Sequence, residues 1–292
     1  MRPTAFEIPV EQMPPLPDHT QLPDTDGSIS DNSLAHSQSN LLTGSLRPKL
    51  LKLHPDGQFF VASDVGIYFR FTEPVLAGCK SPDWYYVPGV GQMLNGRYRR
   101  SYVLWKEVLK PCLVIEFVSG DGSEEHDRTP DTGKFWVYER AICADYYAIY
   151  DVQHPSIELY RLVNERYQGV PANANGRYPV PPMDIELGLW KGHFHGVTAP
   201  WLRAWDAGTG KMLTIAEEGI EDLEAGLEGT RELLDEQVAE TEKERKRADK
   251  ATKRANQQAV EKEKEGKRAD EATKRAEQLA AKMRALGIDP EA

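Results

Sequence analysis

The chain has 292 residues, enough for one large domain or two of ordinary size. Its formal net charge is −10 and its pI is near 5.3, which argues against a nucleic-acid-binding class, although a local basic patch would override that total. Three widely spaced cysteines, Cys79, Cys112 and Cys143, fit neither a disulfide framework nor a zinc site. The sequence has no signal-peptide pattern and no apolar run of membrane-spanning length, which predicts a soluble protein of the reducing cytoplasm.

The N-terminal region differs in composition from the segment that follows it. Residues 1–37 are rich in Pro, Asp, Ser and Asn and carry too little apolar surface to offset the entropy of ordering. This predicts an extended or disordered arm. Residues 39–53 carry Leu41, Leu42 and Leu46 at helical spacing, so we expect a helix to open a folded domain over residues 38–210.

The folded domain alternates helix and strand signals. Residues 58–71 predict a hairpin or a bent strand around Ser63-Asp64, and residues 81–90 predict a short strand that ends at Pro88-Gly89. The further predicted elements are an apolar strand at 112–118, an aromatic-rich helix at 133–142 and strands at 145–152 and 157–162. This order predicts an α/β or α+β domain built on a mixed sheet.

Residues 211–292 form a charged tail. The segment EKERKRADKATKRANQ at 242–257 recurs as EKEGKRADEATKRAEQ, displaced by 21 residues, which is three heptads. A candidate coiled-coil seam, interrupted by Lys262, contains Leu227, Leu234, Ala248, Ala255, Ala269, Ala276 and Met283. A weak coiled coil and a solvated helix with i,i+4 ion pairs both fit this pattern. The basic stretch 243–254 could contact phosphates, but its interspersed acids favour a solvent-exposed face.

One residue of the apolar strand needs a partner. Glu116 lies within LVIEFV, and an ionised carboxylate is costly to bury alone. Asp83 stands at the start of the preceding predicted strand, and Lys134 at the start of the predicted helix. Two acids and a lysine are the minimum set for metal-dependent phosphodiester hydrolysis, in which the acids hold Mg²⁺ and the lysine orients water or stabilises developing charge. On the residues alone, a surface salt bridge is the commoner explanation of such a set.

Several separated motifs are shared with a known family. The run PCLVIEFVSGDGSEEHDRTPDTGKFWVYERA, followed by DYYAIYDV and IELYRL, closely resembles the Uma-type (Uma-two) restriction endonuclease family of the PD-(D/E)XK nuclease superfamily. Upstream, LHPDGQFFVASDVGIYF and GCKSPDWYYVPGV fit the same pattern, and the charged helix ending in RALGIDP resembles an appendage of one branch. The resemblance covers about residues 40–205 and the tail. It implies a restriction-endonuclease-like mixed sheet flanked by helices.

The resemblance implies a role for each member of the set. Asp83 matches the Pro-Asp acid and Glu116 the second acid, so both would bind Mg²⁺, or Mn²⁺ in its place, together with the carbonyl of Phe117. Classical members carry a lysine two residues after the second acid, where this chain has Val118. In the family the lysine is displaced onto the following helix, which makes Lys134 its equivalent.

Other polar residues are assigned less specific roles. Asp64 lies near the region of a further superfamily acid, but Ser-Asp-Val-Gly is typical of a turn. The acidic loop 120–131 could supply a second metal site, but its spacing fits no calcium motif, so we expect it to be mobile at the mouth of the site and to gate substrate. Arg128 could reach a phosphate, but an ion pair with neighbouring acids is favoured. His193 and His195 lack a third ligand and are expected at the surface. Four aromatic residues are expected to fill the core: Trp84, Tyr85, Tyr86 and Tyr138.

Together these features favour a metal-dependent endonuclease that hydrolyses DNA and leaves a 5′-phosphate and a 3′-hydroxyl, with Asp83, Glu116 and Lys134 as catalytic residues. Superfamily members often act as dimers, and the tail would pair two copies. The alternative is a catalytically inactive nucleic-acid-binding or assembly protein on the same fold that oligomerises through the tail. The net charge of −10 favours this alternative slightly.

Overall fold

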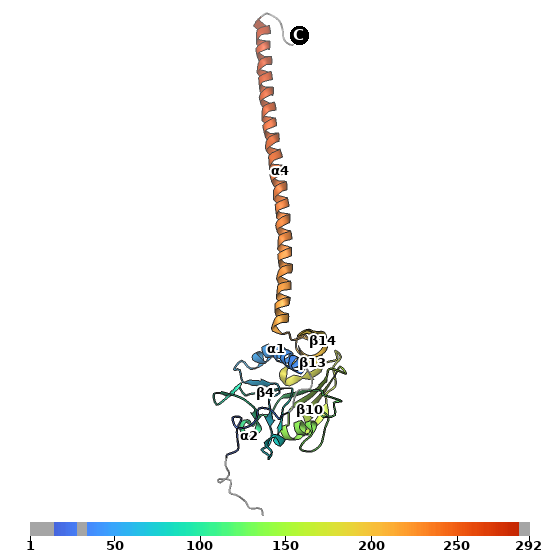
Figure 1. The fold of residues 1–292 in the computed structure, drawn as a ribbon. Coiled ribbons are helices and arrows are strands. Elements are labelled where there is room, and N and C mark those ends of the chain that lie inside the picture. Colours follow the sequence, from blue (N-terminus) through green and yellow to red (C-terminus); the bar gives the residue numbers. More distant parts are fainter. Residues whose placement is uncertain (1–14, 28–33, 286–292) are drawn as a thin grey trace, which may run out of the picture. The chain divides into compact units, whose positions relative to one another are not determined.

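The computed structural model describes residues 15–27 and 34–285, and the chain divides into two compact units, Met1–Gly219 and Ile220–Ala292 (Figure 1). The predicted N-terminal arm therefore lies partly outside the described residues. Its segment 15–27 has no helix or strand, yet Leu22 is buried and the Trp105 indole N–H donates to the carbonyl of Pro17 at 3.0 Å. No helix in the described residues is long and apolar enough to cross a membrane.

A six-stranded mixed sheet forms the centre of the first unit. Its strands lie in the order β1–β4–β8–β9–β10–β11, and neighbours are antiparallel except β8 and β9, which are parallel. The strands are β1 (Phe59–Ala62), β4 (Trp84–Pro88), β8 (Leu113–Phe117), β9 (Tyr146–Asp151), β10 (Ser156–Val163) and β11 (Arg166–Gly169). A parallel pair needs a long crossover, which here contains α3 (Lys134–Trp136) and the π-helix η3 (Val137–Ile142). The predicted fold class, a mixed α+β domain, is confirmed.

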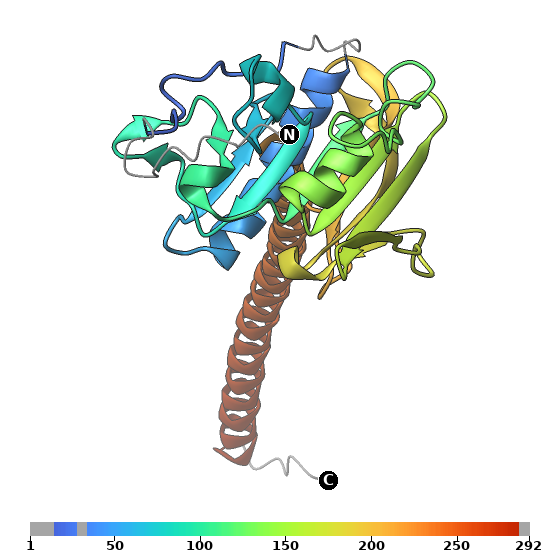
Figure 2. The same ribbon diagram turned by 90° about the horizontal axis from the view of Figure 1, so that it is seen from below.

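The two faces of this sheet are covered by different elements. Because side chains alternate along a strand, Trp84 and Tyr86 pack with helix α1 (Ala35–Leu53), whereas Tyr85 and Val87 pack with α3 and η3. Figure 2 shows helix α1 on one face of the sheet and the consecutive helical segments α3 and η3 on the other. The aromatic residues Trp84, Tyr85, Tyr86 and Tyr138 are buried, so their predicted place in the core is confirmed.

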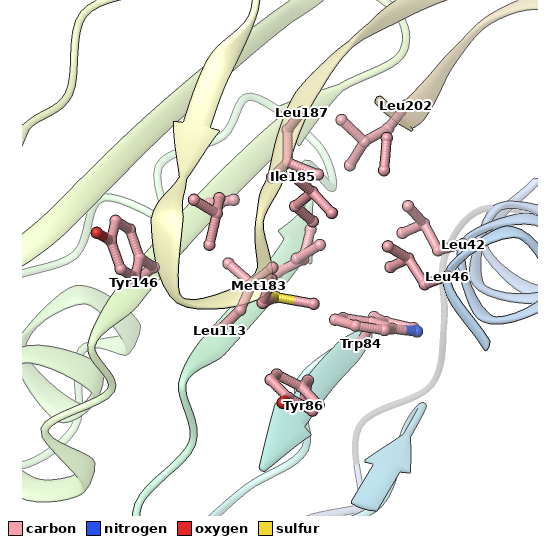
Figure 3. Close-up of a cluster of buried hydrophobic side chains, with 14 of the residues drawn as sticks. Leu42, Leu46, Trp84, Tyr86, Leu113, Tyr146, Met183, Ile185, Leu187 and Leu202 are labelled. Carbon is pink, nitrogen blue, oxygen red and sulfur yellow. The ribbon is translucent and has the colours of Figure 1, made fainter. Parts of the chain in front are cut away.

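Helix α1 binds the sheet through its leucines. The predicted helix over 39–53 is confirmed, and it begins four residues earlier, at Ala35. Leu42 and Leu46 are fully buried against Trp84 and against a second sheet (Figure 3). That sheet has the order β12–β13–β14 and consists of β12 (Tyr178–Val180), β13 (Ile185–Phe194) and β14 (Val197–Asp206), with the 3-10 turn η4 (Pro181–Met183) between the first two. The Trp84 indole N–H donates to Thr43 Oγ1 at 3.0 Å, which fixes the helix to β4.

Residues 58–71 form neither of the predicted arrangements, a hairpin or a single bent strand. The first strand of this segment, β1, pairs with β4, and its second strand, β2, belongs to another sheet. Asp64 lies between them with φ 55°, a left-handed turn that redirects the chain. The remaining elements are β2 (Ile67–Tyr68), η2 (Val75–Gly78), β3 (Cys79–Lys80), β7 (Tyr102–Val103) and α2 (Leu104–Glu107), with the small hairpin of β5 (Met93–Leu94) and β6 (Arg97–Tyr98).

The predicted charged tail is helical from Ala216 to Ala285, as helix α4. Of its larger apolar side chains, Leu227, Leu234 and Val260 are exposed. The pairing of α4 with a second copy in a coiled coil stays a prediction.

We expect Leu46→Ala to lower the free energy of unfolding by about 2–5 kcal/mol, because the variant leaves a cavity between α1 and the sheets. Urea unfolding monitored by tryptophan fluorescence measures the change. The matched control is Leu51→Ala on the same helix, where the side chain is 46% exposed and the expected change is within about 0.5 kcal/mol. Equal effects at both positions would contradict the packing described for α1.

Candidate active site

The register of two strands places the two predicted acids opposite one another. In the antiparallel pair of β4 and β8, Trp84 lies opposite Ile115, so Asp83, just before β4, lies opposite Glu116. The pairing of β4 with β8 therefore brings together two acids that are 33 residues apart in the sequence. Both residues line the same pocket, which has a volume of about 650 Å³ and also contacts Lys134.

Backbone and side-chain hydrogen bonds orient Asp83. Its Oδ2 accepts from the backbone N–H of Phe117 at 2.6 Å. Its own carbonyl accepts from the Ser39 hydroxyl at 3.0 Å, which connects the site to α1. Phe117 therefore contributes its amide to the position of Asp83. The predicted role of the Phe117 carbonyl as a metal ligand stays a prediction.

Glu116 has the partners that its burial requires. The residue is only 1% exposed, and its Oε1 accepts a short hydrogen bond from the Tyr138 hydroxyl. Its Oε2 lies 3.2 Å from Lys134 Nζ. Lys134 and Tyr138 are four residues apart, about one helical turn, so the α3–η3 crossover presents both donors on one side. An acid is tolerated within an apolar strand here because two donors from the next element meet it.

Lys134 lies among three carboxylates. Its Nζ is 3.2 Å from Glu116 Oε2 and 3.2 Å from Glu125 Oε1, and 3.7 Å from Glu124 Oε2. Glu125 is fully buried, whereas the side chain of Glu124 is 70% exposed. The close lysine contacts are therefore the two buried ones, where screening by water is weakest.

The electrostatics of the site follow from this crowding. Burial, and after it the charge of Glu116, raises the pKa of Asp83 to about 8. Burial also raises the pKa of Glu116, against the opposing effects of Lys134 and Tyr138. Burial alone would lower the pKa of Lys134, but the charges of Glu116 and Glu125 outweigh it and raise the pKa, so the amine keeps its proton. The site therefore holds more carboxyl groups than ammonium groups.

The donor chemistry of the site fits a hard divalent cation. Mg²⁺ prefers carboxylate and carbonyl oxygens and is commonly held by one or two carboxylates. Asp83 and Glu116 supply two facing carboxyl groups, and burial raises the pKa of both because it disfavours their charged forms, which a bound cation would favour. The described residues contain no group of three or more His, Cys, Asp or Glu side chains arranged around a metal position, so a cation here would rely on the two acids and backbone or water oxygens.

A comparison with protein families identifies the family of this chain. Residues 11–199 match the model of the family Uma2, described as "Putative restriction endonuclease". The chain belongs to the Uma2 family. The family thus indicates a nuclease. A comparison with curated proteins finds no match.

In this Uma2 domain, Glu125 is the site residue that sequence reasoning missed. It lies in the acidic loop 120–131, which was assigned only a mobile, gating role. Its carbonyl accepts from the Tyr147 hydroxyl at 2.9 Å, which anchors that part of the loop to β9. Its Oε2 is buried without a hydrogen-bond partner among the described residues. The loop contains five acids, and no spacing rule singles out Glu125 among them, so only the fold identifies it.

The other predicted polar residues have mixed outcomes. Asp64 occupies the predicted turn, but it also lines the site pocket, and burial raises its pKa. The expected ion pairs of Arg128 are wrong, because its guanidinium lies 3.6 Å from the centre of the Phe135 ring. His193 and His195 are exposed, as predicted, and hydrogen-bond to Thr198 and Ser37, in that order.

The raised pKa of Asp83 predicts how stability depends on pH. Between its ordinary value of 3.8 and about 8, the folded protein keeps a proton that the unfolded chain releases, so stability falls as pH rises. For metal-free protein in EDTA, we expect a slope of up to about 1.4 kcal/mol per pH unit from this group. Asp83→Asn removes this contribution and flattens the curve measured by urea unfolding.

The exposed Asp121 provides the matched control. Its pKa is lowered, by its hydrogen bonds with Ser123, so Asp121→Asn leaves the slope between pH 4 and pH 8 unchanged. An Asp83→Asn variant that keeps the wild-type slope would show that Asp83 is ionised throughout this range.

Proposed function

We propose that this Uma2 protein is a Mg²⁺-dependent endonuclease that hydrolyses phosphodiester bonds of DNA. The observation that supports this most is the pairing of Asp83 with Glu116 across two strands, with Lys134 at 3.2 Å from the second acid. The pocket that they line is large enough to admit a phosphodiester and part of a nucleoside. The family match supports the same class of enzyme.

Asp83 and Glu116 would hold the metal, with the carbonyl of Phe117 as a further ligand. When bound, Mg²⁺ stabilises charge on the phosphate and lowers the pKa of an attacking water. A cation bound at Glu116 would replace part of the charge compensation that its carboxylate receives from the hydrogen bonds of Lys134 and Tyr138. Mn²⁺ is expected to substitute, because it takes the same oxygen ligands.

Lys134 would orient the attacking water and stabilise the phosphate charge. Its raised pKa keeps the amine protonated, so it acts as a hydrogen-bond donor and a positive charge rather than as a general base. The water oxygen forms a bond to phosphorus while the bond from phosphorus to the 3′-oxygen breaks. The attacking water releases a proton to solvent and the departing 3′-oxygen takes one up from solvent, which leaves a 3′-hydroxyl and a 5′-phosphate.

We expect Glu116→Gln to abolish plasmid nicking and to weaken Mg²⁺ binding at least tenfold, because the variant removes one of two metal-binding charges. Isothermal titration of Mg²⁺ or Mn²⁺ and a plasmid cleavage assay on the same samples measure both effects. The matched control is Asp121→Asn, an exposed acid of the loop that follows β8, which lies outside the pocket lining. It should behave as wild type.

The outcomes separate the nuclease from its alternative. Metal binding and nicking that vanish together in Glu116→Gln support the nuclease. Metal binding by wild-type protein with no cleavage of plasmid, single-stranded DNA or RNA would favour a catalytically inactive nucleic-acid-binding or assembly protein. Wild-type protein that binds neither metal would overturn the proposed site.

Glu125 is a positioning residue for Lys134 rather than a metal ligand. Glu125→Gln keeps an acceptor but removes a buried charge, so we expect kcat to fall about tenfold, roughly the effect of one charged hydrogen bond. Mg²⁺ affinity should change by less than about threefold, which separates this role from that of Glu116. The neighbouring Glu124→Gln is the control, because that side chain is 70% exposed and 3.7 Å from the amine. Equal losses in both variants would contradict the positioning role.

A further inference from the structure

Helix α4 carries opposite charges along its length. Residues 216–242 contain eleven acidic side chains and one basic side chain. Residues 243–275 contain thirteen basic and seven acidic side chains, and the basic ones are all exposed. The net charge of −10 for the whole chain therefore hides a basic segment of about thirty residues. The net charge of the whole chain was therefore a poor predictor of nucleic-acid binding by this segment, because electrostatic interactions in salt solution act over short distances.

The continuous helix also sorts these charges around its circumference. Within 243–275, eleven of the thirteen basic residues fall on three adjacent heptad positions, which together form one face. This basic face consists of Lys243, Lys246, Arg247, Lys250, Lys253, Arg254, Lys264, Lys267, Arg268, Lys274 and Arg275. Five of the seven acids lie off it, so the acids that looked interspersed in sequence are largely separated in space.

Few of these basic residues are neutralised within the helix. Lys246 lies 3.8 Å from Glu242 and Lys267 lies 2.8 Å from Glu263, and both pairs are exposed. Exposed pairs of this kind are weak. The other nine residues of the basic face form no ion pair with any described residue. A face of this kind attracts a polyanion.

The internal repeat gives the basic face a spacing. Its two blocks, 243–254 and 264–275, are displaced by 21 residues, which corresponds to a rise of about 32 Å along an α-helix and a rotation of about 60°. One turn of B-DNA rises about 34 Å. A helix lying along a duplex would therefore bring each block to the same strand on successive turns, within the reach of flexible Lys and Arg side chains.

The side of α4 opposite the basic face indicates whether the helix fits a nucleic acid or a membrane surface as its partner. A helix that lies in a membrane interface needs a wide apolar face opposite its charges. Here that side carries Ala248, Thr252, Ala255 and Ala259, which bury little apolar area.

We propose that the basic face of α4 binds the phosphate backbone of duplex DNA, with its two blocks one helical turn of the duplex apart. This concerns the same substrate class as the proposed function but depends only on the charges of α4. Binding in EDTA tests it without any cleavage, so failure of either proposal can be recognised separately.

The test measures binding of the full-length protein to a fluorescent duplex by anisotropy, in EDTA, over a series of salt concentrations. The double variant Arg247→Gln/Lys253→Gln removes two charges from the basic face. Arg245→Gln/Lys262→Gln removes one Arg and one Lys that lie off it and so has the same net charge. Glutamine is a good helix former, and circular dichroism checks that α4 is retained in both variants.

We expect the on-face variant to reduce the slope of log K against log salt by about 1.8, which corresponds to two lost phosphate contacts, and the off-face variant to leave it nearly unchanged. The second-block variant Arg268→Gln/Lys274→Gln should weaken binding to a duplex of about 24 base pairs but not to one of about 10 base pairs. Equal losses in the on-face and off-face variants would overturn the proposal. So would wild-type protein that binds phosphatidylserine vesicles but not DNA.

Discussion

The site depends on the burial of one negative charge in the central sheet. Glu116 is tolerated in β8 only because Tyr138 and Lys134 reach it from the crossover that follows. This requirement fixes the helix against the sheet and points its polar side at the pocket. Glu125 then completes the surroundings of Lys134 from a third segment, the acidic loop. Three stretches of chain are thus positioned by the need to compensate a single carboxylate.

The parallel pairing of β8 and β9 explains why these stretches meet. A parallel neighbour obliges the chain to cross the sheet, and the crossover carries the loop, α3 and η3 past the end of β8 where Glu116 lies. The antiparallel neighbour β4 brings Asp83 to the same end from the other side. The candidate site forms at this edge because β8 pairs antiparallel with β4 on one side and parallel with β9 on the other.

Much of the fold and of the candidate site could be predicted from the sequence. The predictions that failed did so for physical reasons. Glu116 was recognisable because a carboxylate in an apolar run needs compensation, and Lys134 because it opens the next helix. Glu125 was not, since loop conformation is set by tertiary contacts such as the Tyr147 hydrogen bond. The prediction of a hairpin or a bent strand over residues 58–71 failed at Asp64, where a positive φ sends the two strand-like runs into different sheets. In α4, acidic and basic residues are interspersed in the sequence, but the continuous helix places most of them on different faces.

The excess of negative charge around Lys134 has a consequence for the order of binding. The carboxyl groups of Glu116, Glu124 and Glu125 lie 3.2–3.7 Å from the single ammonium of Lys134, and Asp83 lines the same pocket. A phosphate that approaches this pocket alone meets net repulsion, whereas a cation meets attraction. For the proposed nuclease we therefore expect ordered binding, with the cation first and the nucleic acid second, because a bound cation would remove the repulsion that an approaching phosphate meets.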